Sequence, residues 1–217
     1  MKAIKIFSTT IIIVVILFTS CKNKSSESVN ELKKRTELTK EATKGKYAIK
    51  SGIVEYKTQM MGMNAKQVFT FDDYGKKEIT EVMMEMMGTK IHSVTLNKDG
   101  FIYNYDMINK TGTKRPATLV KTADIDFENM TKELMTDMNI KKEGRESFLG
   151  KVCEKVSIDN KKMQMKGNYL IYKGIPLKVN TDLGTIKMNL LAEKFTENPV
   201  LAKDKFTIPA DIKISEK

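Results

Sequence analysis

The chain has 217 residues, of which 41% are hydrophobic and 30% charged, and its formal net charge is +11. Its single His excludes a His-rich zinc site and argues against a Ser-His-Asp enzyme. Its two Cys exclude a disulfide-stapled scaffold and Cys-type zinc fingers. The hydrophobic fraction excludes a disordered polyelectrolyte and is sufficient for one ordinary core.

The first twenty residues predict a secretory signal. Lys2 and Lys5 precede an unbroken apolar run, Ile11–Phe18, and two small residues follow before Cys21. A basic start, a short apolar segment and small residues before a cleavage site are typical of signal peptides. The run is too short to span a bilayer, which takes about 20 apolar residues. We therefore expect residues 1–20 to be removed; the alternative is an uncleaved membrane anchor.

The segment that ends at Cys21 resembles the lipobox of bacterial lipoproteins, although Phe18 stands where that motif favours Leu. The resemblance implies that Cys21 becomes the mature N-terminus and carries a diacylglycerol and an N-acyl chain such as palmitate. Several acyl chains hold a protein on a membrane because each buried methylene contributes about 0.8 kcal/mol. The expected location is the cell envelope, at the outer membrane, on its periplasmic face or at the cell surface.

Residues 21–46 are expected to form a flexible or helical tether. They are rich in Ser, Lys, Glu and Thr, and cannot bury enough apolar surface to fold alone. A charged helix over residues 30–44 would be marginal. An alternative function for the stretch after Cys21 is an export signal for surface display. Without residues 1–20 the chain carries a net charge of +9.

Residues 47–217 are expected to form a single antiparallel β domain. From Val54 onward the apolar residues alternate with polar ones, which is typical of half-buried strands. Turn residues such as those at 72–75 and 97–100 separate the alternating stretches. The expected strands, about nine, cover residues 54–60, 67–71, 80–86, 90–97, 101–107, 151–159, 163–173, 175–183 and 186–192.

One helix is predicted at about 126–140, where the apolar residues Phe127, Met130, Leu134 and Met138 recur at intervals of three and four. Asp126 is its expected N-cap. The fold class is therefore mainly β (α+β): a curved antiparallel sheet, or half-barrel, with one central helix. A large sheet tends to curl because strand twist accumulates. The alternative is a flat-packed sandwich with the helix outside.

Four stretches of the expected domain carry a family resemblance: Tyr47–Tyr56, Phe71–Glu78, Phe148–Lys155 and Lys205–Pro209. Together they extend over most of residues 47–214, and they resemble an uncharacterised family of Gram-negative lipoproteins. More distantly, the layout is similar to the half-barrels of the lipoprotein carrier LolA and its receptor LolB, which shelter acyl chains. These resemblances imply a lipid-sized apolar pocket and no catalytic residues.

The 15 Met are the unusual feature of the composition, and nine of them lie in three clusters within residues 60–63, 83–87 and 163–165. Thioethers can bind Cu(I), or the clusters can form an interaction surface. Adjacent strand residues point to opposite faces, however, and Met fills irregular apolar spaces well, which favours a pocket lining. No metal or other cofactor is expected. The expected lining residues are Met84, Met86, Tyr103, Tyr105, Met188, Leu190, Phe127, Met130 and Leu134.

No sequence motif predicts catalysis: there is no HExxH, CxxC, phosphate-binding Gly loop or nucleophile elbow. His92 is expected to be structural, and Cys153 a buried apolar residue, with redox or intermolecular disulfide chemistry as the alternative. The basic charge suits anionic lipid headgroups or a solvated surface rather than nucleic acid. The sequence therefore predicts a lipid-anchored, non-enzymatic envelope protein that binds an apolar or amphiphilic ligand. The alternatives are a protein-interaction or scaffold module of an envelope complex and, less favoured, copper binding.

Overall fold

The computed structural model describes residues 45–60, 62–117, 125–184 and 186–216. The expected signal peptide, the lipidation site Cys21 and nearly all of the expected tether lie outside these described residues. Met61, from the first methionine cluster, lies outside them as well.

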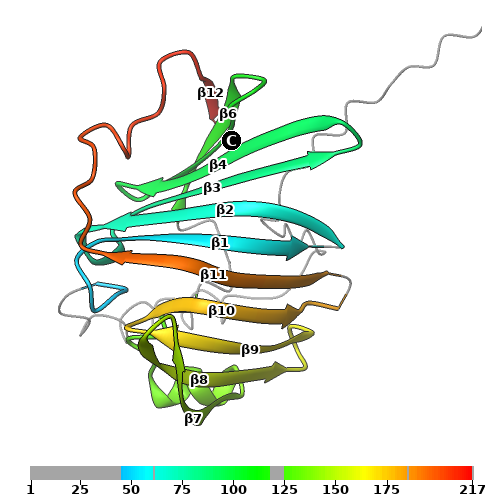
Figure 1. Cartoon of the computed structure of the whole chain (residues 1–217), viewed down its shortest axis with the longest axis vertical. Helices are drawn as coiled ribbons and strands as arrows, with labels where there is room; N and C mark the ends of the chain where they lie inside the picture. Colours follow the sequence, from blue (N-terminus) through cyan, green and yellow to red (C-terminus); the bar gives the residue numbers. More distant parts are fainter. Residues whose placement is uncertain (1–44, 61, 118–124, 185, 217) are drawn as a thin grey trace, which may run out of the picture.

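The described residues form one curved, open sheet of twelve strands with almost no helix, which confirms the mainly β half-barrel (Figure 1). The strand order is β12-β6-β5-β4-β3-β2-β1-β11-β10-β9-β8-β7. Neighbours pair antiparallel except β12 and β6, which run parallel. The strands are β1 (Gly52–Met60), β2 (Met63–Asp72), β3 (Lys77–Met86), β4 (Thr89–Lys98), β5 (Phe101–Asp106), β6 (Thr111–Pro116), β7 (Ile140–Phe148), β8 (Lys151–Asn160), β9 (Met165–Tyr172), β10 (Ile175–Asp182), β11 (Lys187–Glu197) and β12 (Lys213–Glu216).

Two meanders meet in the middle of the sheet. Strands β1 to β6 follow one another outward in one direction, and β11 to β7 follow in the other. The pairing of β1 with β11 joins them, so that Val54 lies opposite Phe195. A register shift between Glu55 and Tyr56 interrupts this pairing. Because β-bulges increase local twist, the irregularity adds curvature where the two halves join.

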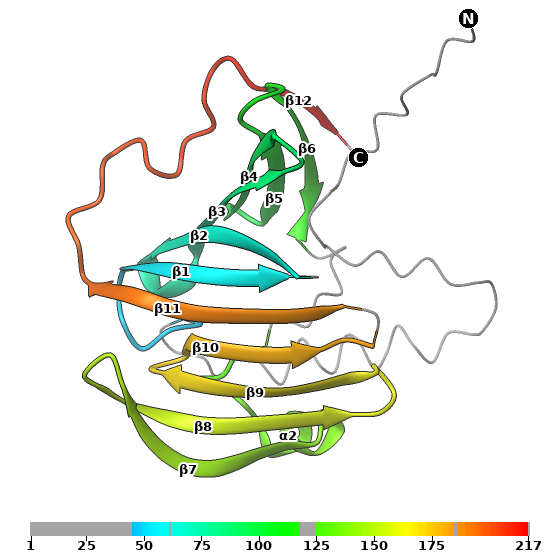
Figure 2. The same ribbon diagram turned by 45° about the vertical axis from the view of Figure 1, so that its right-hand side comes forward.

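The expected central helix is much shorter than predicted. Only α2 (Lys132–Asp137) is α-helical among the described residues, and it lies against the edge strand β7 (Figure 2). Its N-cap is Thr131, whose hydroxyl accepts the backbone N–H of Leu134 at 3.1 Å. Asp126 is therefore not the N-cap of this helix. Its carboxylate accepts the backbone N–H groups of Glu128 and Asn129, which forms a turn. The apolar residues that recur at intervals of three and four therefore do not lie on one helix. Phe127 and Met130 lie in the bent segment before α2, and Leu134 lies on α2 itself. A second short helix, the 3-10 turn η1 (Asp73–Gly75), follows β2.

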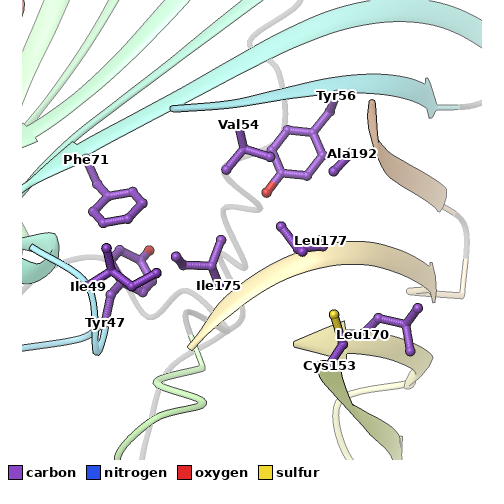
Figure 3. Close-up of a cluster of buried hydrophobic side chains, with 10 residues drawn as sticks. All are labelled: Tyr47, Ile49, Val54, Tyr56, Phe71, Cys153, Leu170, Ile175, Leu177 and Ala192. Atoms are coloured by element: carbon purple, nitrogen blue, oxygen red, sulfur yellow. The ribbon is translucent and has the colours of Figure 1, made fainter. Parts of the chain in front are cut away.

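Two of the three buried clusters in the described residues lie where the sheet is covered by the chain around residues 125–138 or by the segment before β1. The first, at the centre of the sheet, is shown in Figure 3 and contains Tyr47, Ile49, Val54, Tyr56, Phe71, Cys153, Leu170, Ile175, Leu177 and Ala192. The second contains Ile140, Val156, Ile158, Met165, Tyr169, Ile171 and Val179, against which Ile125, Phe127, Met130, Met135 and Met138 pack.

The third buried cluster lies on the opposite face of the sheet. Its strand residues are Ile79, Val94, Leu96 and Tyr105, and Ile212 covers them together with Phe206 and Ile208. Cross-strand partners share a face, and the pairing from β1 to β4 places Ser93 on the same face as Tyr56. The cluster residue Val94 follows Ser93 in the strand and therefore lies on the other face. We call the face that carries Tyr56 the inner face. The segment between β11 and β12 therefore covers the outer face of β3–β5, where it is seen at one side of Figure 1.

Candidate ligand-binding site

The inner face of the central strands borders a cavity of about 240 Å³. Tyr56 on β1 lies opposite Gln67 on β2, and Phe69 on β2 lies opposite Thr80 on β3, so all four share this face. From the other half of the sheet, Leu190 on β11 lies opposite Val179 on β10. The cavity is lined by Lys46, Tyr47, Tyr56, Gln67, Phe69, Glu78, Thr80, Pro176, Val179 and Leu190.

The cavity has an apolar wall from both meanders. Tyr56 and Val179 are buried, and Phe69 and Leu190 are partly buried against the first cluster. The aromatic rings of Phe69 and Phe71 stack at 5.7 Å between centroids, and Tyr47 packs on both. Large rigid side chains of this kind bury much area at low conformational cost. This wall can therefore receive an alkyl chain or another apolar group.

The cavity also has a polar end, built around Glu78. Glu78 is only 9% exposed, and its carboxylate accepts hydrogen bonds from Lys46 Nζ at 2.9 Å and from the Tyr47 hydroxyl at 2.5 Å. A buried charge is tolerated when it is paired and hydrogen-bonded, as here. Gln67 and Thr80 add neutral polar groups to the same lining. The site is therefore amphiphilic: it combines an apolar wall with a charged end at Glu78, and Gln67 adds a polar group opposite Tyr56.

The inner face itself changes from apolar to polar along a single cross-strand row. The row runs through directly opposed residues from β11 to β6: Phe195, Val54, Phe69, Thr80, Thr95, Asn104 and Thr113. The Thr95 hydroxyl donates to Asn104 Oδ1 at 2.9 Å within its polar half. At about 4.8 Å between neighbouring strands, the polar half extends for roughly 14 Å from β3 to β6. The change of character at β3 coincides with the cavity.

The segment before α2 fills the neighbouring part of the inner face. Phe127 packs on Tyr169 with ring centroids 5.3 Å apart, and Met130 packs on the same cluster. The Asn129 side chain donates to the carbonyl of Gly45 at 2.9 Å, which ties this segment to the chain before β1. The inner face is thus covered beside β8–β10, while the cavity between Tyr56 and Leu190 remains.

The nine predicted lining residues lie in several different parts of the structure, and only Leu190 lines the cavity. Phe127, Met130 and Met188 pack on the second cluster beside it. Met84 and Met86 lie on the inner face toward the β3–β4 hairpin, half-buried. Leu134 on α2 is half-buried but is not among the residues that pack on the second cluster. Met135 and Met138 pack there instead.

The expectation for Tyr103 and Tyr105 was wrong. Both lie on the outer face, in the cluster covered by Ile212, because they are opposite Leu96 and Val94. Burial raises the pKa of Tyr105 to about 12, and the nearby charge of Glu81 adds to the effect. Sequence alternation shows that the two tyrosines share a face, but it does not show which face the C-terminal segment covers.

The second methionine cluster does not converge in space. On β3, Met84 shares the inner face with Ala65, whereas Met83 lies opposite His92 on the outer face. Met87, in the following turn, is fully exposed. His92 Nε2 is 3.5 Å from a carboxylate oxygen of Glu81. Within the described ranges there is no group of three or more His, Cys, Asp or Glu side chains able to hold a metal ion.

A second, larger hollow of about 430 Å³ lies near the β1–β2 and β3–β4 hairpins. Its lining includes Lys57, Lys66, Glu85 and Glu193, which are charged, and draws on side chains from both faces of the sheet. A surface of solvated charges offers no water-excluded wall. The smaller cavity beside Tyr56, with its buried aromatic wall, is therefore the better candidate site.

No protein-family model matches the chain, and no curated protein matches its sequence. Among solved structures, an uncharacterized conserved protein from Thermus thermophilus matches with a TM-score of 0.54 at 12% identity, over 88% of this chain and 100% of that chain. This likeness supports the fold alone.

Two further structures are similar at lower scores. The MucA/MucB complex of Pseudomonas aeruginosa matches with a TM-score of 0.47 at 10% identity, over 88% of this chain and 64% of that chain. The lipoprotein LppX of Mycobacterium tuberculosis matches with a TM-score of 0.43 at 13% identity, over 81% of this chain and 99% of that chain. In the part of the chain that the structure describes, no helix is long and apolar enough to cross a membrane.

Proposed function

We propose that this chain is a lipid-anchored protein of the cell envelope that binds an amphiphilic, lipid-like ligand on the inner face of its curved sheet and catalyses no reaction. The observation that carries the proposal is the cavity, in which the apolar wall of Tyr56, Phe69 and Leu190 meets a polar end at Glu78. Ligand pockets combine a mainly apolar lining with a few placed polar groups. An alkyl chain fits the wall, and a polar head fits the other end.

The envelope location is supported by the sequence ahead of the described residues. The basic start, the apolar run Ile11–Phe18 and the lipobox-like stretch ending at Cys21 favour export and lipidation. A ligand-binding domain tethered to a membrane is surrounded by amphiphiles. The expected result for Cys21→Ala is an unprocessed, unlipidated precursor, and normal labelling of that variant by radioactive palmitate would contradict the anchor.

The ligand is tested by purifying the protein from its native membranes and identifying co-extracted lipids by mass spectrometry. Two adjacent residues give a matched pair of variants. Leu190 points into the cavity, whereas Leu191 lies on the outer face and is 41% exposed. Leu190→Trp should fill the cavity and lower ligand affinity about tenfold or more, as expected from the cost of overpacking.

The control, Leu191→Trp, places the same side chain on the same strand but away from the cavity. It should retain the wild-type amount of lipid. Equal lipid content in both variants, or no lipid in the wild type, would contradict ligand binding in the cavity. Among the large exposed apolar residues, Met87, Ile108 and Val200 lie on separate connections, and isolated exposures of this kind are normal for protein surfaces.

A further inference from the structure

Arg115, on β6, is half-buried, and no residue in the described parts of the chain neutralises its charge. Its Nε and Nη2 atoms are buried and have no hydrogen-bond partner there. No ion pair to Arg115 is formed among these residues either, whereas its neighbour Lys114 pairs with Glu216 at 3.3 Å. Buried guanidinium groups are costly unless anions and acceptors satisfy them. The unsatisfied donors therefore point to a ligand.

The sheet places Arg115 on the inner face. It lies directly opposite Ile102 on β5, and Asn104 is its diagonal neighbour across the same pair of strands. Lys114 points the other way, with its ammonium 4.3 Å from the centroid of Phe101 on the outer face. Arg115 thus belongs to the polar half of the inner face, at the end farthest from the apolar wall of the cavity.

The groups around Arg115 favour an anion. Asn104 Oδ1 is engaged by the Thr95 hydroxyl, so its amide N–H groups remain as further donors. The two carboxylates on the inner face of β3–β5 are already occupied. Glu78 binds Lys46 and Tyr47, and Asp106 accepts the backbone N–H groups of Ile108 and Asn109 at 2.7 and 2.9 Å.

We propose that Arg115 binds an oxyanion, and that this oxyanion is the headgroup of the amphiphile whose apolar part enters the cavity. The planar guanidinium fork matches phosphate and carboxylate oxygens in a bidentate geometry. The polar half of the sheet between the cavity and β6 spans roughly 14 Å along the strand order, which leaves room for a headgroup and its linker. The assignment of the anion to an amphiphile rests on the proposed function; the anion site itself does not.

The experiment measures binding of three probes by titration calorimetry: dodecyl phosphate, the neutral 1-dodecylglycerol and inorganic phosphate. For dodecyl phosphate, Arg115→Met should lower the affinity about 10- to 100-fold, the range expected for hydrogen bonds to a charged group. Arg115→Lys should fall in between, because it keeps the charge and loses the fork. Lys114→Met, the adjacent outer-face control, should bind like the wild type.

The stability of Arg115→Met gives a second readout, because a purely structural role of Arg115 predicts the opposite change. If the guanidinium has no partner in the free protein, ligand-free Arg115→Met should unfold at the same or a higher urea concentration than the wild type. Added phosphate should raise the wild-type melting temperature and leave that of Arg115→Met unchanged. A destabilised Arg115→Met with unchanged affinity for dodecyl phosphate would overturn the proposal.

The three probes separate the two proposals. Binding of phosphate that depends on Arg115, with no tighter binding of dodecyl phosphate, would support the anion site with a free anion as its occupant and contradict the amphiphile. Equal binding of both dodecyl compounds, unaffected by Arg115→Met, would support the cavity and overturn the headgroup site.

Discussion

The phenol of Tyr56 donates a hydrogen bond of 2.6 Å to the backbone carbonyl of Pro176, which connects β1 to β10 across the intervening β11. Tyr56 is only 5% exposed, and burial raises its pKa well above the usual range, so the phenol remains a donor at physiological pH. Pro176 lies where β10 changes register against β9. The bond therefore satisfies a carbonyl at an irregularity of the sheet, beside the cavity.

Removing this hydroxyl should destabilise the fold. For Tyr56→Phe we expect a loss of about 1 kcal/mol in the free energy of unfolding, and up to about 3 kcal/mol if the carbonyl stays dry and unpaired. Urea unfolding measures the loss. Tyr103→Phe is the control, since the Tyr103 hydroxyl makes no hydrogen bond within the described residues, and it should be nearly neutral. Equal losses in both variants would show that the Tyr56 bond contributes nothing.

The strands predicted from the sequence are those in which apolar and polar residues alternate, because one face of each is buried. Strand β7 was not predicted. It is an edge strand that is exposed from Lys141 to Ser147, so its sequence shows no alternation of apolar and polar residues. Strand β6, Thr111–Pro116, has no large apolar residue, so no alternation marks it either. Its burial depends on β5 and β12, which neighbouring sequence does not reveal.

The candidate site was predicted less completely than the fold. Leu190 could be identified from its alternation, but Gln67, Thr80 and Glu78 could not, because their burial comes from Lys46, Tyr47 and the curvature of the sheet. In the sequence, nothing distinguishes Arg115 from its basic neighbour Lys114, so its partial burial could not be predicted. The unsatisfied nitrogens that single it out are visible only in three dimensions.

The C-terminal segment is predicted to be a required part of the fold. Ile212 is 8% exposed and packs against Leu96 and Tyr105 on the outer face. Ile212→Ala should lower the free energy of unfolding by about 2 to 4 kcal/mol, in the range for truncating a buried Ile. Ile108→Ala removes the same atoms from a residue that is 51% exposed and should change stability by less than about 0.5 kcal/mol. Denaturation midpoints with similar slopes would compare the two, and equal effects would contradict the covering role.

Cys153 is predicted to be inert in the folded protein. It is fully buried in the first cluster, and burial raises the pKa of its thiol, so little thiolate forms near neutral pH. In a Cys21→Ser background, alkylation by iodoacetamide should be about 10³-fold slower in the native than in the unfolded state, since reaction requires opening of the core. Mass spectrometry follows the labelling. Fast native labelling, or a dimer linked through Cys153, would instead favour a redox role.

Glu197 is predicted to make stability depend on acid pH. Its carboxylate accepts a hydrogen bond from Lys151 and lies 3.6 Å from Lys173 Nζ. Burial by itself would raise the carboxyl pKa, but the hydrogen bond from Lys151 and the two lysine charges outweigh it and lower the pKa. The same contact raises the pKa of Lys151, so the pair persists through neutral and moderately basic pH.

Because the pKa of Glu197 is lower in the folded than in the unfolded chain, its stabilising contribution is complete above the unfolded value of about 4.3 and is lost as the pH falls through the folded pKa. Glu197→Gln should therefore be less stable than the wild type at pH 7, by less than about 1 kcal/mol for so accessible a pair. The difference should shrink steadily below pH 4 in urea unfolding measured from pH 3 to 8. Glu143→Gln changes an exposed carboxylate on β7 that forms no ion pair in the described ranges, and should show no such trend. A stability difference for Glu197→Gln that stays constant across this pH range would mean that the side chain acts by packing rather than by its charge.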